Sequence, residues 1–212
     1  MPHDDFHSEP VLGLPETPPE GERLLWQGRP RVWGLAREAL NIHWVILYFA
    51  GFALWRGLAV GLEQGLATGF KAASPFLVLG AITVLILWGL AAVFARTTMY
   101  TITNRRVAMR IGAALTVTLN LPHRWIASAD LQLRSDGTGT IALDLRGENK
   151  LSFLVCWPHT RPWRMRHTQP ALRAIPEAEK VARILAEAAT ARLTQSASAD
   201  RPTVAPAAVA AE

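Results

Sequence analysis

The sequence predicts an α+β membrane protein in which a two-helix transmembrane hairpin is inserted after the first strand of a β domain, and a C-terminal helix caps that domain. Three patterns predict this class. Two apolar segments lie close together in the first half of the chain, period-two alternation of apolar residues follows them, and a helical repeat of apolar residues comes next. These patterns are typical of membrane-spanning helices, half-buried strands and an amphipathic helix, respectively.

The N-terminal part is predicted to contain one strand before the membrane. Residues 1–20 are rich in Pro and Glu, and we expect them to be disordered. Residues 21–38 are expected to form the first part of the domain, because Leu24, Leu25 and Trp26 can be buried by a strand. The best partner for this strand is the β domain that follows the second apolar segment, so the hairpin would be an insertion into one domain.

The two apolar segments predict transmembrane helices over residues 39–62 and 76–95, joined by a loop over residues 63–75. The second segment runs 20 residues without a charge before Arg96, long enough to cross a hydrocarbon core of roughly 30 Å. In the first segment, the small residues Ala50, Gly51 and Ala53 would allow close helix approach, although they could equally face lipid or the second helix.

Four residues are predicted to lie at the membrane interfaces: Trp44, Trp55, Arg56 and Arg96. Arg56 falls about 26 Å along a helix that starts near Ala39, where it can extend to the far interface beside Trp55. An intramembrane functional arginine is the alternative. Two interpretations are open for His43, which is next to Trp44 in the sequence. It is either a ligand of a bound pigment or a side chain exposed to solvent.

Orientation follows from the basic residues near the segments. Residues 20–38 and 96–115 carry four arginines each, whereas residues 57–75 carry only Lys71 and one acid, Glu63. Short loops rich in Lys and Arg stay in the cytoplasm. Both termini are therefore predicted to be cytoplasmic, and the 63–75 loop periplasmic.

Residues 96–193 are predicted to form the main part of the cytoplasmic domain. The segment 97–112 predicts a β-hairpin with its turn at Asn-Arg-Arg, and SDGTG at 135–139 predicts another that pairs Asp130–Arg134 with Thr140–Leu145. A short strand is expected over Leu151–Cys156. From Pro176 to residue 193, apolar residues recur at helical spacing, and the Ser-, Ala- and Pro-rich residues 194–212 are expected to be disordered.

No recognisable catalytic or metal-binding motif is present. The chain lacks a Gly-rich phosphate loop, paired cysteines, HExxH and GxSxG, and its single cysteine excludes an intrachain disulfide. Only His3 and His7 among the six histidines have the spacing of a helical metal site, and they lie in the predicted disordered segment. We expect a protein that is not an enzyme and that has no cofactor and no metal.

The predicted cytoplasmic domain is basic. Residues 96–193 hold 15 Lys or Arg against 7 Asp or Glu. Such a surface next to a bilayer attracts anionic lipids, at about 1 kcal/mol for each well-placed basic residue. Nucleic acid is the other common partner of a basic surface, but the membrane tether and the lack of a binding motif argue against it.

The densest feature is CWPHTRPWRMRHTQP at 156–170, in which Trp, Arg and His alternate with three prolines. Prolines restrict the backbone, so a stiff loop that displays its side chains is expected. Trp and Arg are enriched at binding hot spots. One reading is a protein-docking surface, and the other is a loop whose Trp rings pack on the sheet while its arginines face lipid phosphates. The candidate partner-binding residues are Trp157, His159, Arg161, Trp163, Arg164 and Arg166.

These motifs together resemble a known family. LLWQGRP, the transmembrane pair, YTITNRRVAMRIG and DGTGTI resemble the bacterial pleckstrin-homology-like (PH-like) membrane proteins. Within that group, GLPETPPEGERLLWQG, ARTTMYTITNRRVAMRIG and WPHTRPWR resemble the PuhB-type photosynthetic complex assembly proteins of purple phototrophic bacteria. The resemblance implies a PH-like β sandwich or barrel in the inner (intracytoplasmic) membrane, and a homodimer that assists assembly of the reaction centre and its light-harvesting 1 antenna.

Two function classes follow. The first is a non-enzymatic assembly factor that binds light-harvesting 1 and reaction-centre subunits transiently. The alternative is a PH-like envelope protein that binds the membrane surface or its lipids and has no photosynthetic partner.

Overall fold

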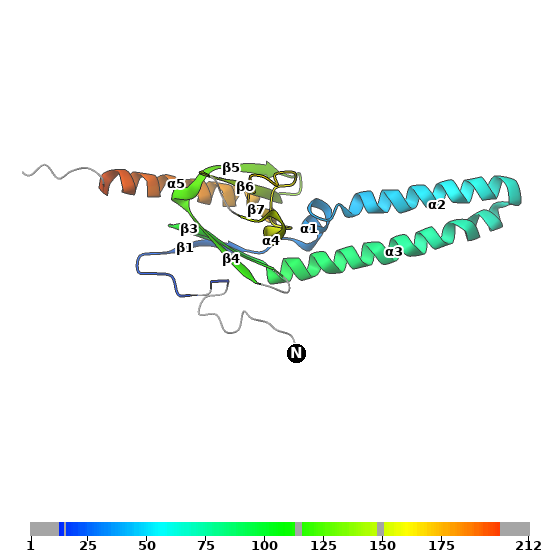
Figure 1. The fold of residues 1–212 in the computed structure, drawn as a ribbon, viewed down its shortest axis with the longest axis horizontal. Coiled ribbons are helices and arrows are strands. Elements are labelled where there is room, and N and C mark those ends of the chain that lie inside the picture. The colour runs from blue at the N-terminus through cyan, green and yellow to red at the C-terminus, as the bar shows by residue number, and fades with distance from the viewer. Residues whose placement is uncertain (1–12, 15, 113–115, 148–150, 200–212) are drawn as a thin grey trace, which may run out of the picture.

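The computed structural model describes residues 13–14, 16–112, 116–147 and 151–199, with side chains through Arg192. Two long helices, α2 (Ile42–Gln64) and α3 (Leu66–Thr97), extend side by side from one end of a β domain (Figure 1). The C-terminal helix α5 (Ala178–Ala199) lies at the opposite end of that domain. A short helix, α1 (Val32–Glu38), stands between the domain and the base of the two long helices.

The β domain consists of two antiparallel sheets. The first has the order β1 (Leu24–Gly28), β2 (Met99–Thr103), β3 (Arg106–Ile111) and β4 (Val117–Pro122). The second has the order β5 (Ile126–Leu133), β6 (Gly139–Leu145) and β7 (Ala171–Ile175). The 3₁₀ helix η2 (His123–Trp125) connects them. The sequence predicted a β sandwich or barrel. The structure shows two separate sheets and no closed barrel among the described residues.

The long-helix pair is an insertion into this domain, as predicted. β1 pairs with β2 across the whole α1–α3 segment, with Trp26 opposite Ile102 and Gly28 opposite Tyr100. Because β1 completes the first sheet, the two helices leave and re-enter the domain at neighbouring strands. The domain is thereby attached to the helix pair by two chain segments.

The predicted turn between β2 and β3 also clamps the residues that precede β1. Within it, the Thr103 hydroxyl accepts a hydrogen bond of 3.0 Å from the Arg106 backbone N–H. The Asn104 side chain accepts one of 2.8 Å from the Arg23 N–H, and Arg106 Nε donates to Glu22 at 2.9 Å. The Asn-Arg-Arg sequence thus has a structural use, which is to hold the N-terminal strand in register.

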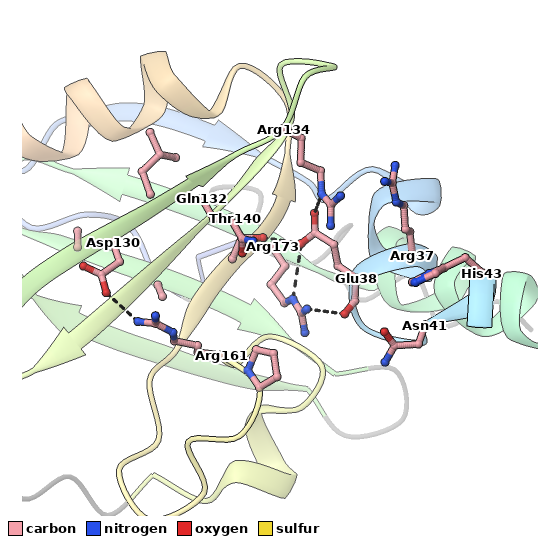
Figure 2. A pocket seen from close by; sticks show the side chains of 14 residues that line it. Arg37, Glu38, Asn41, His43, Asp130, Gln132, Arg134, Thr140, Arg161 and Arg173 are labelled. Carbon is pink, nitrogen blue, oxygen red and sulfur yellow. Dashed lines mark hydrogen bonds and ion pairs between the residues drawn. The ribbon is translucent and has the colours of Figure 1, made fainter. Parts of the chain in front are cut away.

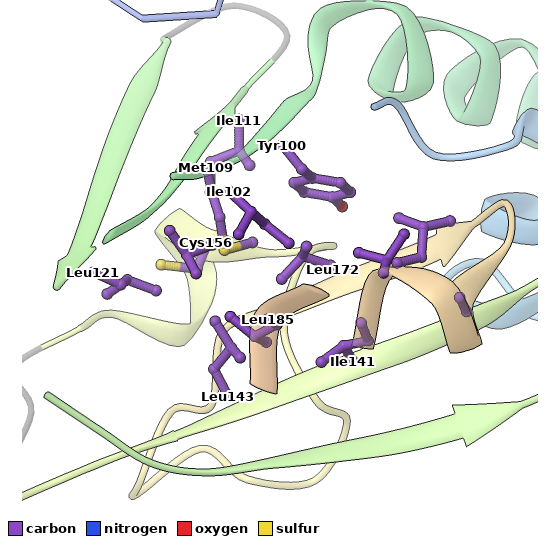
Figure 3. Close-up of a cluster of buried hydrophobic side chains, with 14 of the residues drawn as sticks. Tyr100, Ile102, Met109, Ile111, Leu121, Ile141, Leu143, Cys156, Leu172 and Leu185 are labelled. Carbon is purple, nitrogen blue, oxygen red and sulfur yellow. The ribbon is translucent and has the colours of Figure 1, made fainter. Parts of the chain in front are cut away.

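The hydrophobic core lies where the two sheets and α5 meet (Figure 3). It combines the alternating apolar residues of β3 and β6 with residues of β2 and β7 and with one face of α5, whereas Leu131 and Leu133 of the predicted alternation are exposed. Its main members are Tyr100, Ile102, Met109, Ile111, Ile141, Leu143, Leu172, Val181 and Leu185. Each large aliphatic side chain removed from water contributes roughly 1.5–3 kcal/mol, so this cluster is the main source of the domain's stability.

The helices α2 and α3 are long and apolar enough to cross a membrane. Their most hydropathic windows are only 6% and 17% buried, which is unlike a core helix of a soluble domain. Large apolar side chains such as Leu62 and Phe70 are exposed along their length. We therefore treat them as the two candidate membrane spans.

The predicted loop over residues 63–75 was wrong. Gly65, with φ of 91°, alone separates the two helices, and α3 continues through Pro75. A proline inside a helix leaves the carbonyl four residues earlier without its N–H donor. Here the Ser74 hydroxyl donates to that carbonyl, Lys71 O, at 2.9 Å, so the helix tolerates Pro75. The candidate spans are thus 42–64 and 66–97 rather than 39–62 and 76–95.

The predicted strand over Leu151–Cys156 was also wrong, because residues 153–156 form the one-turn helix α4 (Phe153–Cys156). The run does not join either sheet. The helical turn instead places Cys156 in the core, where burial raises the pKa of its thiol.

The ends of the fold differ from the predicted boundaries. Leu14 is 1% exposed, so the segment 1–20 is packed at this residue; residues 1–12 and 15 lie outside the described part of the chain. The C-terminal helix starts at Ala178, after Glu177 with φ of 50°, and continues to Ala199. Alanine has the highest helix propensity, which favours this extension past residue 193. The prediction for 200–212 lies outside the described residues.

Candidate docking surface

The Trp- and Arg-rich loop leaves α4 and returns to β7, and its two ends are held together. Thr160 and Pro170 form an isolated β-bridge, and the Arg161 N–H donates to Gln169 O at 2.9 Å. The Ala171 N–H donates to His159 O, also at 2.9 Å. The base of the loop is therefore a short hairpin continuous with β7, and residues 162–166 form its exposed tip.

His159 lies in this base and not on the surface, since its side chain is 0% exposed. Its Nδ1 lies 2.6 Å from the Tyr100 hydroxyl, and its Nε2 lies 3.0 Å from the Thr98 hydroxyl. Burial lowers the pKa of His159 to about 3 and raises the pKa of Tyr100. The prediction that His159 is displayed for partner binding is therefore corrected: a neutral imidazole anchors the loop to β2.

The hydrogen bonds of His159 and Tyr100 connect three parts of the domain. The Tyr100 oxygen accepts a hydrogen bond of 3.3 Å from the Arg173 backbone N–H and also contacts His159 Nδ1. The other ring nitrogen, Nε2, contacts the Thr98 hydroxyl next to β2. The chain of hydrogen bonds joins β7, β2 and the loop base.

Arg173 connects the same loop base to the foot of the candidate spans (Figure 2). Its Nη1 donates to Pro158 O at 3.1 Å, and its Nη2 donates to the carbonyl of Glu38, the last residue of α1, at 2.7 Å. Burial lowers the pKa of Arg173, and the opposing charge of Glu38 raises it. The guanidinium thus holds the loop and α1 together.

Glu38 completes this connection. Its carboxylate accepts hydrogen bonds of 2.6 Å from Arg134 Nε and from the Thr140 hydroxyl, and lies 3.9 Å from Arg173 Nε (Figure 2). Hydrogen bonds to charged groups contribute about 1.5–3 kcal/mol each, and a buried carboxylate needs them. The loop therefore has a fixed position relative to the first candidate span.

Four of the six candidate residues are exposed: Trp157, Trp163, Arg164 and Arg166. Trp163 is 90% exposed and has φ of 64°, which turns the tip of the loop. Trp157 is 39% exposed and packs its ring edge-on against Phe94 of α3, with centroids 5.7 Å apart. Arg161 is partly exposed and donates to Asp130 of β5 at 2.7 Å (Figure 2).

Sequence reasoning missed several residues of this region. Leu154, Val155 and Met165 are exposed large apolar side chains close to the loop in sequence, and the strand prediction for 151–156 concealed the first two. Glu38 and Arg173 were missed as well. The signal for Arg173 was present, because ALRAI is an apolar strand with one charge at its centre.

The predicted membrane-interface residues all have exposed side chains. Trp44 lies near the start of α2 and contacts the His43 ring, and Arg96 lies in the last turn of α3. Trp55 and Arg56 lie farther along α2, and Arg56 is about 12 Å short of its end at Gln64. No group of His, Cys, Asp and Glu able to hold a metal occurs among the described residues.

Comparison with known proteins identifies the family to which this chain belongs. The family model described as "Bacterial PH domain" matches residues 45–189, from α2 to α5. The chain belongs to the bacterial PH domain family. It is also 46% identical over 197 residues to the "Uncharacterized 23.7 kDa protein in puhA 5'region" of Rhodobacter capsulatus, covering 92% of each chain. No solved structure matches the chain.

In this bacterial PH domain protein, the family match includes both candidate spans together with the sheets. β1 lies outside the matched residues, yet it pairs with β2 and completes the first sheet. The loop at 157–166 lies within the match.

Proposed function

We propose that this protein is a non-enzymatic, membrane-bound assembly factor for the photosynthetic reaction centre and its light-harvesting 1 antenna, and that it binds their subunits transiently. One observation carries the proposal: an exposed Trp- and Arg-rich tip is held at a fixed position beside the base of two candidate membrane spans. A partner inserted in the same membrane would meet this tip at the bilayer surface.

The photosynthetic assignment is supported by the relative. Its printed description places it in the puhA 5' region of Rhodobacter capsulatus, and its 46% identity covers nearly the whole chain. This genomic position favours a photosynthesis-related role, in agreement with the resemblance of WPHTRPWR and the N-terminal motif to PuhB-type proteins. In the proposal the protein is a homodimer in the inner (intracytoplasmic) membrane, with both termini in the cytoplasm.

The tip residues are suited to protein recognition. Trp163 offers a large rigid apolar surface, and Arg164 and Arg166 can donate several hydrogen bonds to carboxylates of a partner. Because the loop base is already ordered by His159 and Arg173, little conformational entropy is lost there on binding. In the alternative, a lipid-binding envelope protein without a photosynthetic partner, the same basic domain binds the membrane surface or its lipids.

The test is the double variant Trp163→Ala/Arg164→Ala. The tagged protein is purified in mild detergent from phototrophically grown cells, and co-purified subunits are quantified by mass spectrometry. We expect recovery of antenna and reaction-centre subunits to fall by about tenfold or more, as truncation of hot-spot residues does. The pigment absorption of the purified sample should fall with it.

The matched control is Trp125→Ala/Arg124→Ala. This pair on η2 is also exposed and removes the same two side chains from a different part of the domain. It should capture partners like the wild type. Equal capture by the Trp163/Arg164 variant would refute the docking role, and wild-type protein with subunits at background level would favour the lipid-binding alternative.

A further inference from the structure

A cavity of about 720 Å³ lies between the β5–β6 hairpin and the α1–α2 junction (Figure 2). It borders the exposed tip of the loop, because Arg161 and Pro162 contribute to one wall, but Trp163, Arg164 and Arg166 do not line it. Its charged lining consists of four arginines and two carboxylates, Arg37, Arg134, Arg161, Arg173, Glu38 and Asp130. The lining therefore has an excess of positive charge.

The internal ion pairs do not use all of this positive charge. Arg134 engages Glu38 through Nε alone, and Arg161 engages Asp130 through Nη1. Arg37 is exposed and makes no hydrogen bond or ion pair with any residue that the structure describes. Arg173 Nε is buried without a hydrogen-bond partner, 3.9 Å from the nearer Glu38 oxygen. Donors therefore remain available for an anion.

The N-terminus of α2 adds to the positive potential in the cavity. Asn41 and His43, on either side of the first residue of α2, both line the cavity. The Asn41 side chain makes no capping hydrogen bond, and the Trp44 N–H donates to the Asn41 carbonyl at 2.9 Å, so the N–H groups of Ile42 and His43 are the first-turn donors that remain for an anion. The positive end of the helix dipole favours an anion at this position.

The place of the cavity in the fold selects the kind of anion. It opens at the start of the first candidate span, and Trp33 and Trp44, on the two sides of the junction in sequence, are 57% and 64% exposed. Exposed Trp rings at the end of a membrane span are typical of the headgroup region. A cavity of this size is also within the usual range for ligand sites, and larger than a lone phosphate requires.

We propose that this cavity binds the phosphate group of one anionic phospholipid, with Arg37 as a direct ligand and α2 supplying backbone donors. Inorganic phosphate shares the same chemistry but has no acyl chains to insert beside α2. The proposal goes beyond the assembly role and does not depend on it, because Arg37 is not part of the exposed Trp–Arg tip.

The experiment is native mass spectrometry of the full chain in mild detergent, with phosphatidylglycerol or phosphatidylcholine of matched acyl chains. We expect the wild type to retain one phosphatidylglycerol and little phosphatidylcholine. Arg37→Gln should lower the retained fraction about tenfold, as loss of one charged hydrogen bond would. Arg146→Gln is the matched control, since Arg146 is exposed, lies at the other end of β6 and removes the same charge.

A second variant, Gln132→Glu, adds a carboxylate to the lining and leaves every arginine in place. It should weaken phosphatidylglycerol retention as well, with thermal unfolding close to wild type. Equal retention by Arg37→Gln and Arg146→Gln, or equal retention of the two lipids, would overturn the proposal. Arg37-dependent binding of inorganic phosphate that excludes the lipid would assign the site to a free anion instead.

Discussion

Glu38 and Arg173 have side chains that are each 7% exposed, and together with His159 they connect the loop base to α1 and β2. Charges in such positions are tolerated because hydrogen bonds replace the lost water. Tyr100 and Thr98 hold a neutral imidazole in the same region. At the scale of single residues, the Trp–Arg tip therefore depends on buried polar groups that do not themselves reach the surface.

The buried imidazole predicts a pH dependence of stability. The pKa of His159 is about 3 in the folded chain, against 6.5 for an ordinary histidine. Between these values the unfolded chain binds a proton that the folded chain does not, so stability is full above about pH 6.5 and falls as the pH drops towards 3. From pH 7 to pH 5 the loss should be on the order of 2 kcal/mol.

The measurement is the thermal midpoint in detergent for the wild type and His159→Asn. Asparagine can keep one hydrogen bond but does not titrate, so its midpoint should fall less between pH 7 and pH 5. His123 also has a pKa lowered by burial and contributes the same sign in both proteins, so the difference between them isolates His159. Parallel pH profiles would contradict this assignment.

At the scale of elements, glycine residues allow the backbones of the two long helices to come close together. A Cβ atom on Gly69 would lie 2.5 Å from Gly57 O and 2.7 Å from the Cα atom of Gly61. Of the small residues expected to allow close approach, Ala53 is buried, whereas Gly51 has nothing within 4 Å of an added Cβ. The closest backbone-to-backbone approach at a glycine thus lies near the hairpin end, at Gly69, and not at Gly51.

This geometry predicts opposite effects for two Gly→Ala substitutions. Gly69→Ala must push the helix backbones apart and should lower stability by about 1–3 kcal/mol. Gly51→Ala meets open space and should leave stability unchanged or raise it slightly, because Ala favours the helix. Thermal unfolding of both variants in one detergent gives the comparison, and equal midpoints would show that the helices do not pack at Gly69.

At the scale of the whole molecule, the insertion determines how the domain is attached to the two candidate spans. β1 and β2 pair on either side of the helix pair, and α1 packs against α3. The loop base is bonded to α1 through Arg173. A domain attached at two strands and braced by α1 has restricted freedom to rotate relative to the candidate spans.

The proposed orientation is testable by cysteine labelling. Cys156, the single native cysteine, is 1% exposed and should not react. In spheroplasts, Gln64→Cys at the end of α2 should react with a membrane-impermeant maleimide. Ser135→Cys in the β5–β6 turn should react only after permeabilisation. The reverse pattern would place the basic domain in the periplasm and exclude a cytoplasmic docking role.

Local patterns in the chain were sufficient for much of the architecture. Alternation predicted β3 and the β5–β6 hairpin, and apolar length predicted two candidate spans. The apolar run Leu24–Trp26 predicted a strand that joins the later β domain, and β1 does so by pairing with β2, although Leu24 and Leu25 are 44% and 43% exposed and not buried as expected. These features depend on periodicity, turn residues and hydropathy, which neighbouring residues determine.

Other features required the assembled fold. The run 153–156 forms the helical turn α4 where a strand was predicted, and α3 passes Pro75 because the Ser74 hydroxyl donates to the released carbonyl of Lys71. His159 is buried while Trp163 is displayed, although both belong to one Trp–Arg motif. The Glu38–Arg173 contact and the arginine-lined cavity join residues more than 130 positions apart. Such contacts depend on strand order and helix placement, which arise from packing of the whole chain and not from any local segment.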